Sequence, residues 1–170
     1  LMTQHDPTTY ADLSQGRIRH IDFHIRVDFS TNTLAIKAAY QLDAPPRGPL
    51  FLDTFKINLH SAHANGRALT WEFDTHDESR GSRLHLKGLE DDASFTLEFH
   101  TSPDASALQW LTAEQTLGGK HPFLYSQCQS IQARSVFPCQ DTPSVRFTFT
   151  AEVEAPKGLT AVMAAEQAKG

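Results

Sequence analysis

The sequence predicts an all-β domain with the architecture of an antiparallel β-sandwich. Apolar and polar residues alternate in most runs before Pro103, which is the pattern of half-buried strands. Turn-forming residues separate these runs at intervals of roughly ten residues. The chain also has eleven phenylalanines against two tryptophans and two methionines, and phenylalanine favours strands. No segment before Pro103 has the 3.6-residue repeat of a helix.

The length of 170 residues is typical of one domain and is sufficient to bury a single core. The net charge of −5 argues against a nucleic-acid partner, which requires a basic face. No apolar run approaches the roughly 20 residues that cross a membrane, and the first residues lack the features of a secretory signal. We therefore expect a cytoplasmic domain over residues 17–165, preceded by a disordered or loosely held segment at residues 1–16.

The first predicted strand is the clearest one. Over residues 19–29, apolar residues alternate with Asp, His and Arg, which predicts a strand with one wet face. A turn is expected at residues 30–33, and residues 34–42 alternate again. The two segments are expected to form an antiparallel hairpin. Residues 43–49 contain three prolines and one glycine and predict a loop.

The middle of the chain continues in the same manner. Residues 50–60 are expected to form a strand pair or one bent strand. Asn65 and Gly66 form a strong turn signal because both residues tolerate positive φ. Further short strands are expected at residues 69–73, 84–86 and 95–99.

The pattern changes after Pro103. Residues 103–122 run without alternation, which is too long for an ordinary connection and is typical of a functional loop. One helical turn is expected at residues 113–115. Residues 123–129 and 145–153 predict the last two strands, the second of them almost as regular as the first strand of the chain.

The two cysteines, Cys128 and Cys139, are too few for a disulfide framework and lack the C-x-x-C spacing of metal or redox sites. We expect two free thiols with a structural role, a single bridge being the alternative. The chain also lacks a G-x-S-x-G nucleophile turn and a glycine-rich phosphate loop.

Several of the nine histidines have spacings that raise the question of a metal site. His20 and His24 are four residues apart, but on a strand this spacing separates them by about 13 Å, too far for one ion. His60 and His63 are expected on opposite faces of a strand, as solvated surface residues. The sequence therefore predicts no metal site in this chain.

Four runs of residues carry a specific likeness. These are SALQWLT with EQT (residues 106–112 and 114–116), SQCQ (126–129), PCQDTPSVRFTFTAEV (138–153) and, more weakly, LFLDT (50–54). The sequence resembles the N-terminal domain of the zinc aminopeptidases that include leukotriene A-4 hydrolase and membrane alanyl aminopeptidase, and is most similar to the leukotriene hydrolase branch. The P-C-x-D-x-P-x-x-R/K pattern is specific to that family.

The resemblance implies a saddle-like, mostly antiparallel β domain that covers a zinc catalytic domain. It also implies that Gln129, with Gln127 beside it, binds the free α-amino group of the peptide substrate. A side-chain carbonyl oxygen can accept a hydrogen bond from an ammonium group. Asp141 is expected to accept backbone N–H groups at the turn before Pro143. Arg134 and Arg146 are expected to pair with carboxylates that the sequence does not identify.

The catalytic motifs of that family, G-x-M-E-N and H-E-x-x-H, do not occur in these 170 residues. The resemblance therefore implies that the zinc belongs to the parent enzyme, that the partner is a catalytic domain of the same parent chain, and that this chain alone is inactive. The family's domain also extends further, so a piece truncated at its C-terminal end is expected. The alternative is a free-standing β-sandwich binding or scaffold module. A hydrolase that uses its own histidines is disfavoured.

Overall fold

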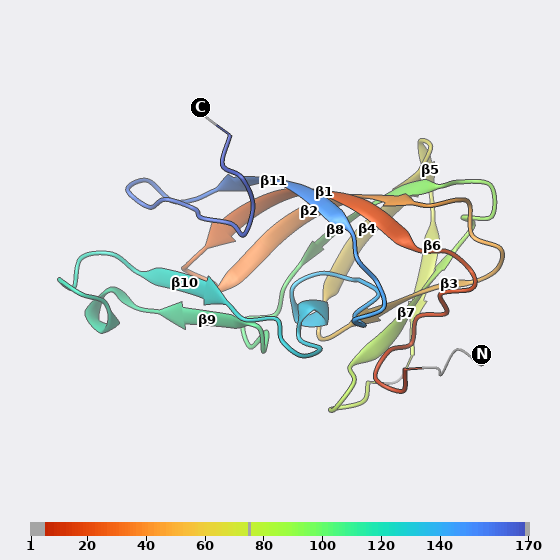
Figure 1. The fold of residues 1–170 in the computed structure, drawn as a ribbon. Helices are drawn as coiled ribbons and strands as arrows, with labels where there is room; N and C mark the ends of the chain where they lie inside the picture. Colours follow the sequence, from red (N-terminus) through yellow and green to blue (C-terminus); the bar gives the residue numbers. More distant parts are fainter. Residues whose placement is uncertain (1–5, 75, 169–170) are drawn as a thin grey trace.

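The computed structural model describes residues 6–74 and 76–168, and its regular secondary structure is almost entirely β-strand (Figure 1). The largest sheet has six strands in the order β11-β1-β2-β8-β4-β5. Its members are β1 (Ile18–Asp28), β2 (Thr33–Leu42), β4 (Asn58–Ala64), β5 (Arg67–Ala68), β8 (Ser94–His100) and β11 (Thr148–Glu154).

Two smaller sheets complete the fold. A three-stranded sheet has the order β3-β7-β6, with β3 (Leu50–Thr54), β6 (Thr70–Phe73) and β7 (Ser82–Lys87). A separate hairpin pairs β9 (Leu108–Leu111) with β10 (Phe123–Ser126). The two short 3-10 helices are η1 (Ala113–Gln115) and η2 (Ala133–Ser135), and η2 lies below the large sheet between the hairpin and the three-stranded sheet (Figure 1). The predicted all-β fold class is confirmed.

The core lies on the inner face of the six-stranded sheet. In β1 and β2 every second residue points inward, and Ile21, Ala38 and Tyr40 are fully buried. Each buried Leu, Ile or Phe side chain contributes about 1.5–3 kcal/mol relative to an exposed one. The remaining core residues come mainly from β3, β7 and β8: Leu50, Leu52, Leu84, Leu86, Phe95, Leu97 and Phe99.

The predicted β1–β2 hairpin is confirmed, since the two strands pair antiparallel over nearly their whole length. The turn signal of Asn65 and Gly66 is also confirmed, because their φ angles are 48° and 75° and they join β4 to β5. Residues 50–60 contribute to two separate strands and not to one bent strand. These strands do not pair with each other: β3 pairs with β7 and β4 with β8.

A β-bulge in β4 corrects one prediction. The pairing with β8 shifts register between Leu59 and Ser61, which makes His60 an extra residue on its strand. His60 and His63 are both exposed, and they share the outer face of the sheet instead of lying on opposite faces. Strict alternation cannot predict this, because a bulge moves every later side chain by one position.

One pair of strands departs from the antiparallel arrangement. β11 pairs with β1 in parallel, from His20 opposite Thr148 to Arg26 opposite Glu154. The sheet is therefore mixed, although its other pairs are antiparallel. β11 begins three residues later than the predicted strand.

The segment at residues 103–122 is more ordered than the long loop that the sequence suggested. It contains β9, which the sequence pattern does not predict, and the expected helical turn at residues 113–115. The predicted strand at residues 123–129 is shorter, because β10 ends at Ser126 and a turn follows.

Residues 6–16 of the segment expected to be loosely held are tied to the domain, whereas residues 1–5 lie outside the described residues. Thr9 and Ala11 are buried, with 4% and 3% exposure. The Thr9 hydroxyl and the Tyr10 N–H both donate to the Asp53 carboxylate, at 2.5 and 2.7 Å. Separately, no helix in residues 6–74 and 76–168 has the length and apolar character needed to cross a membrane.

Candidate functional site

The two predicted site residues lie on a turn directly after β10, which we call the glutamine turn (residues 127–132). The β9–β10 ladder pairs Ser126 with Leu108 and ends with a bond from Gln127 N–H to the Ala107 carbonyl, 2.8 Å. The chain then turns, and Gln132 N–H donates to the Cys128 carbonyl at 3.0 Å. The peptide bond between Gln129 and Ser130 is cis.

Side chains on both sides fix the glutamine turn. The buried Ser135 hydroxyl donates to the Gln132 carbonyl at 2.8 Å and accepts from Ala107 N–H at 3.1 Å. The Gln132 side-chain amide faces two carbonyls and, with its nitrogen toward them, donates to Ser106 and Gln127 at 3.1 and 3.2 Å. The turn is therefore attached to the segments before and after it by bonds that satisfy its backbone.

The two glutamines have different roles within this turn. The side-chain carbonyl of Gln127 accepts the Gln129 N–H at 2.9 Å and so stabilises the turn itself. The Gln129 side chain is exposed and has no hydrogen-bond partner among the residues that the structure describes. Its amide therefore offers one acceptor oxygen and two donor hydrogens to solvent or to a ligand. The structure brings the two predicted residues together, and only Gln129 remains free to bind.

A buried ion cluster, formed by Asp53, Arg134 and Asp141, is joined to the turn through η2, which follows the turn directly in the chain and contains Arg134. Arg134 is 2% exposed although it belongs to the short helix η2. Its Nε donates to the Asp141 carboxylate at 3.1 Å, and one terminal nitrogen lies 3.9 Å from Asp53. The other terminal nitrogen donates to the Arg80 carbonyl at 2.7 Å. Every face of the guanidinium thus meets an acceptor, which a buried charge requires.

Asp53 is fully buried in β3 and accepts three bonds. Besides those from Thr9 and Tyr10, it accepts the Asp141 N–H at 2.9 Å. Burial raises the pKa of the Asp141 carboxyl, and the bonds from Arg134 act in the opposite direction. The predicted role of Asp141 as an acceptor of a backbone N–H is confirmed, although the donor is Arg134 N–H at 3.2 Å and not a residue of the turn before Pro143.

The run Pro138–Asp141 joins this cluster to the six-stranded sheet, and each of its residues has a defined partner. The Pro138 carbonyl accepts the Tyr40 hydroxyl at 2.7 Å, and Cys139 exchanges two backbone bonds with Asp53. The buried Gln140 side chain accepts from Ile18 N–H at 2.9 Å and donates to the Gly16 carbonyl at 2.8 Å. The most characteristic run of the resemblance is therefore a junction between the two sheets.

Both cysteines are free thiols. Burial raises the pKa of the half-buried Cys128, and the negative charge of Asp141 raises it further. Cys139 is 2% exposed, and burial likewise raises its pKa. The thiolate is the reactive form of cysteine, so these thiols are not activated nucleophiles.

The sequence alone identifies no partner for Arg134 and does not distinguish it from Arg146. Arg134 is the buried centre of the ion cluster, whereas Arg146 is exposed and has no ion pair within the described part of the chain. No local signal separates the two residues.

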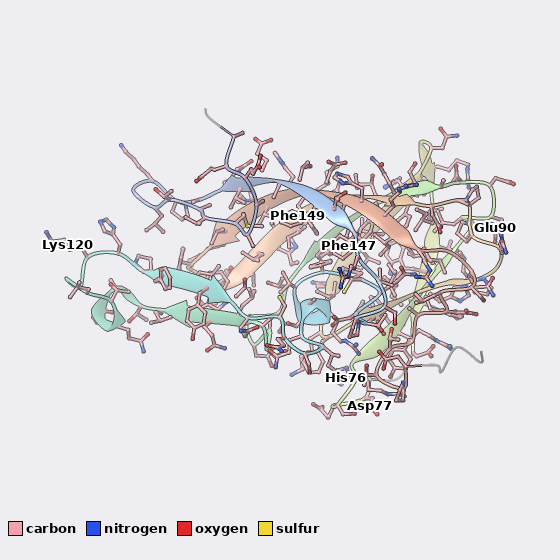
Figure 2. All side chains as sticks on the ribbon, viewed as in Figure 1. His76, Asp77, Glu90, Lys120, Phe147 and Phe149 are labelled. Carbon is pink, nitrogen blue, oxygen red and sulfur yellow. The ribbon has the colours of Figure 1, made fainter. Side chains whose placement is uncertain are left out.

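The hairpin that leads to the glutamine turn extends away from the rest of the domain, with Lys120 at its far end (Figure 2). Its apolar residues Leu117, Phe123 and Tyr125 are 106%, 52% and 48% exposed. The rings of Phe123 and Tyr125 lie 6.1 Å apart. The hairpin thus presents an exposed aromatic pair next to the glutamines.

The family's zinc has no fitting ligand set here. Among residues 6–74 and 76–168, no group of three or more His, Cys, Asp or Glu side chains could hold a metal ion. A hollow of about 280 Å³ lies on the outer face of the six-stranded sheet, and neither glutamine lines it. Gln127 and Gln129 are both exposed, so the glutamine turn is an open surface feature.

Comparisons with known proteins agree with the fold. Residues 17–169 match the family model of the peptidase M1 N-terminal domain. Leukotriene A-4 hydrolase from Xenopus laevis is 36% identical over 169 residues, which cover 94% of this chain and 27% of that protein. Leucine aminopeptidase 2 from Saccharomyces cerevisiae is 35% identical over 160 residues, covering 90% of this chain and 24% of that protein.

The solved structure of a yeast leukotriene A-4 hydrolase in complex with bestatin superposes with a TM-score of 0.84 at 31% identity. The match covers 92% of this chain and 25% of that chain. This chain thus spans about a quarter of the length of the relatives that it matches. The resemblance inferred from the four sequence runs is confirmed, and the chain belongs to the peptidase M1 N-terminal domain family.

Proposed function

We propose that this chain forms the substrate-cleft domain of a zinc-dependent aminopeptidase of the leukotriene A-4 hydrolase type. In this proposal Gln127 and Gln129 help to bind the free α-amino group of a peptide, and the chain does not hydrolyse peptides by itself. The observation that carries the proposal is the free, exposed amide of Gln129 on a turn whose backbone is fixed by its neighbours. Such a turn requires little further ordering when a ligand binds.

The division of work between the two glutamines follows from their bonds. The Gln129 carbonyl oxygen would accept one N–H of the ammonium group. Gln127 would act through Gln129, because its side chain holds the Gln129 N–H at 2.9 Å. The buried ion cluster joined to the turn then serves to keep both residues in place.

The second part of the proposal is that a catalytic domain of the same parent chain is the partner of this domain. The exposed hairpin supports it. Phe123 and Tyr125 leave apolar surface in solvent beside the glutamine turn. Exposed apolar patches of this kind commonly mark an interaction surface. The catalytic domain would cover this patch and supply the zinc, and a cytoplasmic location with both thiols free belongs to the same proposal.

The decisive experiment uses the enzyme in which this domain is joined to its catalytic part. Gln129→Leu removes the proposed bond to the ammonium group, so KM for an aminoacyl substrate should rise about tenfold to a hundredfold, the value of a hydrogen bond to a charged group. Gln109→Leu is the matched control, because Gln109 is also exposed and lies on the neighbouring strand β9. Unchanged kinetics of Gln129→Leu would refute the assignment.

A comparison of substrates separates amino-group binding from a general effect on the cleft. A peptide analogue without the α-amino group should bind to Gln129→Leu with the same affinity as to the unchanged enzyme. Equal losses with both substrates would show that the residue acts in some other way.

The isolated chain provides an independent test. Incubation with a chromogenic aminoacyl substrate and zinc should give no turnover, and zinc-dependent release would overturn the inactive state proposed here. The coding sequence after residue 170 distinguishes the alternative of a free-standing binding module. Downstream G-x-M-E-N and H-E-x-x-H motifs support the aminopeptidase, whereas an immediate stop codon supports the module.

A further inference from the structure

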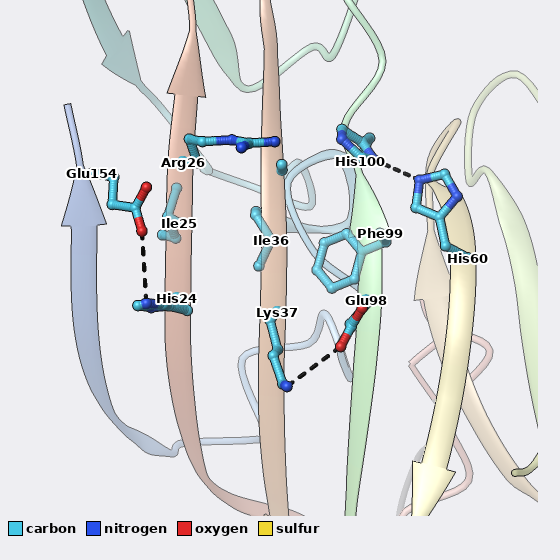
Figure 3. Close-up of a pocket in the computed structure, with 11 residues that line it drawn as sticks. His24, Ile25, Arg26, Ile36, Lys37, His60, Glu98, Phe99, His100 and Glu154 are labelled. Atoms are coloured by element: carbon cyan, nitrogen blue, oxygen red, sulfur yellow. Dashed lines mark hydrogen bonds and ion pairs between the residues drawn. The ribbon is translucent and has the colours of Figure 1, made fainter. Parts of the chain in front are cut away.

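We propose that His60 and His100 form a two-histidine site for a divalent transition-metal ion such as Cu²⁺, Ni²⁺ or Zn²⁺ on the outer face of the six-stranded sheet. Nε2 of His60 lies 2.5 Å from Nδ1 of His100. The two rings stand nearly perpendicular, at 80°, with centroids 4.6 Å apart (Figure 3). His60 is exposed and His100 is half-buried, so an ion can reach them from solvent.

The contact between these nitrogens is what suggests a metal. A neutral imidazole carries one proton and one lone pair on its two nitrogens. At hydrogen-bond distance, two neutral rings can hold only one proton between the two facing nitrogens. A metal ion replaces that proton by accepting a lone pair from each ring. Bonds of about 2.0–2.1 Å to one ion place two nitrogens roughly 3 Å apart, so the rings need to separate only slightly.

The fold brings these residues together from distant parts of the sequence. His60 is the extra residue of the bulge in β4, and His100 ends the neighbouring strand β8, opposite Asn58. Without the bulge, residue 60 would face Glu98 in regular register. Bulges commonly redirect a side chain in this way. Both histidines stand on paired strands of the same sheet, which holds a site more firmly than a loop does.

The charged side chains around the histidine pair affect the expected affinity for a metal ion. The nearby carboxylates of Glu98 and Glu154 are engaged by Lys37 at 3.4 Å and by His24 at 3.9 Å (Figure 3). Arg26 lines the same hollow on the outer face of the sheet as the two histidines, and its positive charge repels a divalent cation.

The site therefore has two protein ligands, and water would complete the coordination. This agrees with the lack of any larger ligand group among the described residues. Imidazole suits copper, nickel and zinc, and Cu²⁺ binds most tightly in the usual order of affinities. The site would have modest affinity and a preference for Cu²⁺ over Zn²⁺.

The test is a titration of the purified chain with Zn²⁺, followed by NMR of the histidine rings, and with Cu²⁺, followed by calorimetry. Zn²⁺ should shift the ring resonances of His60 and His100 first. His60→Gln and His100→Gln should each weaken Cu²⁺ binding at least about tenfold, because mutating even a residue that only supports a metal ligand commonly lowers metal affinity by about this factor. Arg26→Gln should strengthen binding severalfold, because it removes a repelling charge.

Two control variants test whether other histidines bind the ion. His63→Gln removes an exposed histidine from the same strand and face. His24→Gln removes a histidine that lies 3.8 Å from Glu152 and 3.9 Å from Glu154 on the same sheet. Both variants should bind Cu²⁺ as the unchanged chain does. Each variant is first checked by circular dichroism to confirm that it is folded.

The proposal is overturned if the chain binds neither metal, or if affinity is unchanged in both His60→Gln and His100→Gln. It is also overturned if the ring resonances of His24 or His63 shift before those of the pair.

Discussion

The domain contains two groups of ion pairs that differ mainly in burial. In the buried ion cluster, Arg134 and Asp53 are 2% and 0% exposed, and every polar atom of the arginine head has an acceptor. On the outer face of the large sheet, the side chains of Lys37 and Glu98 are 63% and 50% exposed, 3.4 Å apart. Water can replace a partner on the outer face but not in the interior. An ion pair of the same type therefore contributes strongly to stability in the buried cluster and contributes little on the outer face.

The largest expected effect is from Arg134→Met. It leaves Asp53 and Asp141 without their counter-charge in the interior, and breaking a buried pair costs about 3–5 kcal/mol. The free energy of unfolding, measured with urea, checks this. Arg146→Met, an identical change at an exposed position, should stay within about 0.5 kcal/mol. Equal losses in the two variants would mean that the cluster has no special role.

Gly81→Ala tests how tightly the surroundings of the cluster are packed. Gly81 has φ of +79°, and a Cβ there would lie 1.9 Å from the Thr54 carbonyl oxygen, on the residue after Asp53. The backbone has to shift, so we expect a loss of about 2–4 kcal/mol in the free energy of unfolding. Gly66→Ala also has a positive φ but meets open space, and should cost clearly less.

Tyr40→Phe tests the junction between the sheets. The buried Tyr40 ring stacks on Phe95, and its hydroxyl donates to the Pro138 carbonyl. The variant keeps the ring but leaves a buried carbonyl unsatisfied, which costs about 1–3 kcal/mol. Thermal unfolding measures this. No change in stability would show that water or another group satisfies Pro138.

Lys37→Met tests the exposed side of the comparison. We expect a change of about 0–1 kcal/mol in the free energy of unfolding, since exposed pairs contribute little. Added salt should reduce even this difference, because it screens the charges. A loss comparable with that of Arg134→Met would remove the distinction between the two regions.

The smallest effect concerns pH. Bonds from the hydroxyls of Thr8 and then Thr142 lower the pKa of Asp6 from 3.8 to about 2. A lowered folded-state pKa gives stability that is present above 3.8 and is lost as the pH falls toward about 2. Asp6→Asn should therefore lose less stability than the unchanged chain over this pH window. Parallel curves of unfolding free energy against pH would contradict this.

Most of the strands could be predicted from alternation, because the six-stranded sheet has one buried and one exposed face. The bulge at His60 and the parallel contact between β1 and β11 could not, since both depend on which strands become neighbours. The contact of Arg134 with Asp53 joins residues 81 positions apart and leaves no local pattern.

The candidate site was accessible only through the resemblance. The run around Gln127 and Gln129 has the composition of a strand, and the turn that exposes Gln129 depends on Ser135 and Gln132 further along the chain. The separate roles of the two glutamines became visible only with the hydrogen bond between them.

The parallel contact between β1 and β11 has a consequence for biosynthesis. Residues 18–28 leave the ribosome before their partner strand, residues 148–154, which is made more than a hundred residues later. Until then one edge of β1 is unpaired, and an unpaired strand edge can form hydrogen bonds with another nascent molecule. Translation speed and chaperone supply should therefore influence the soluble yield of this domain more than its final thermodynamic stability does.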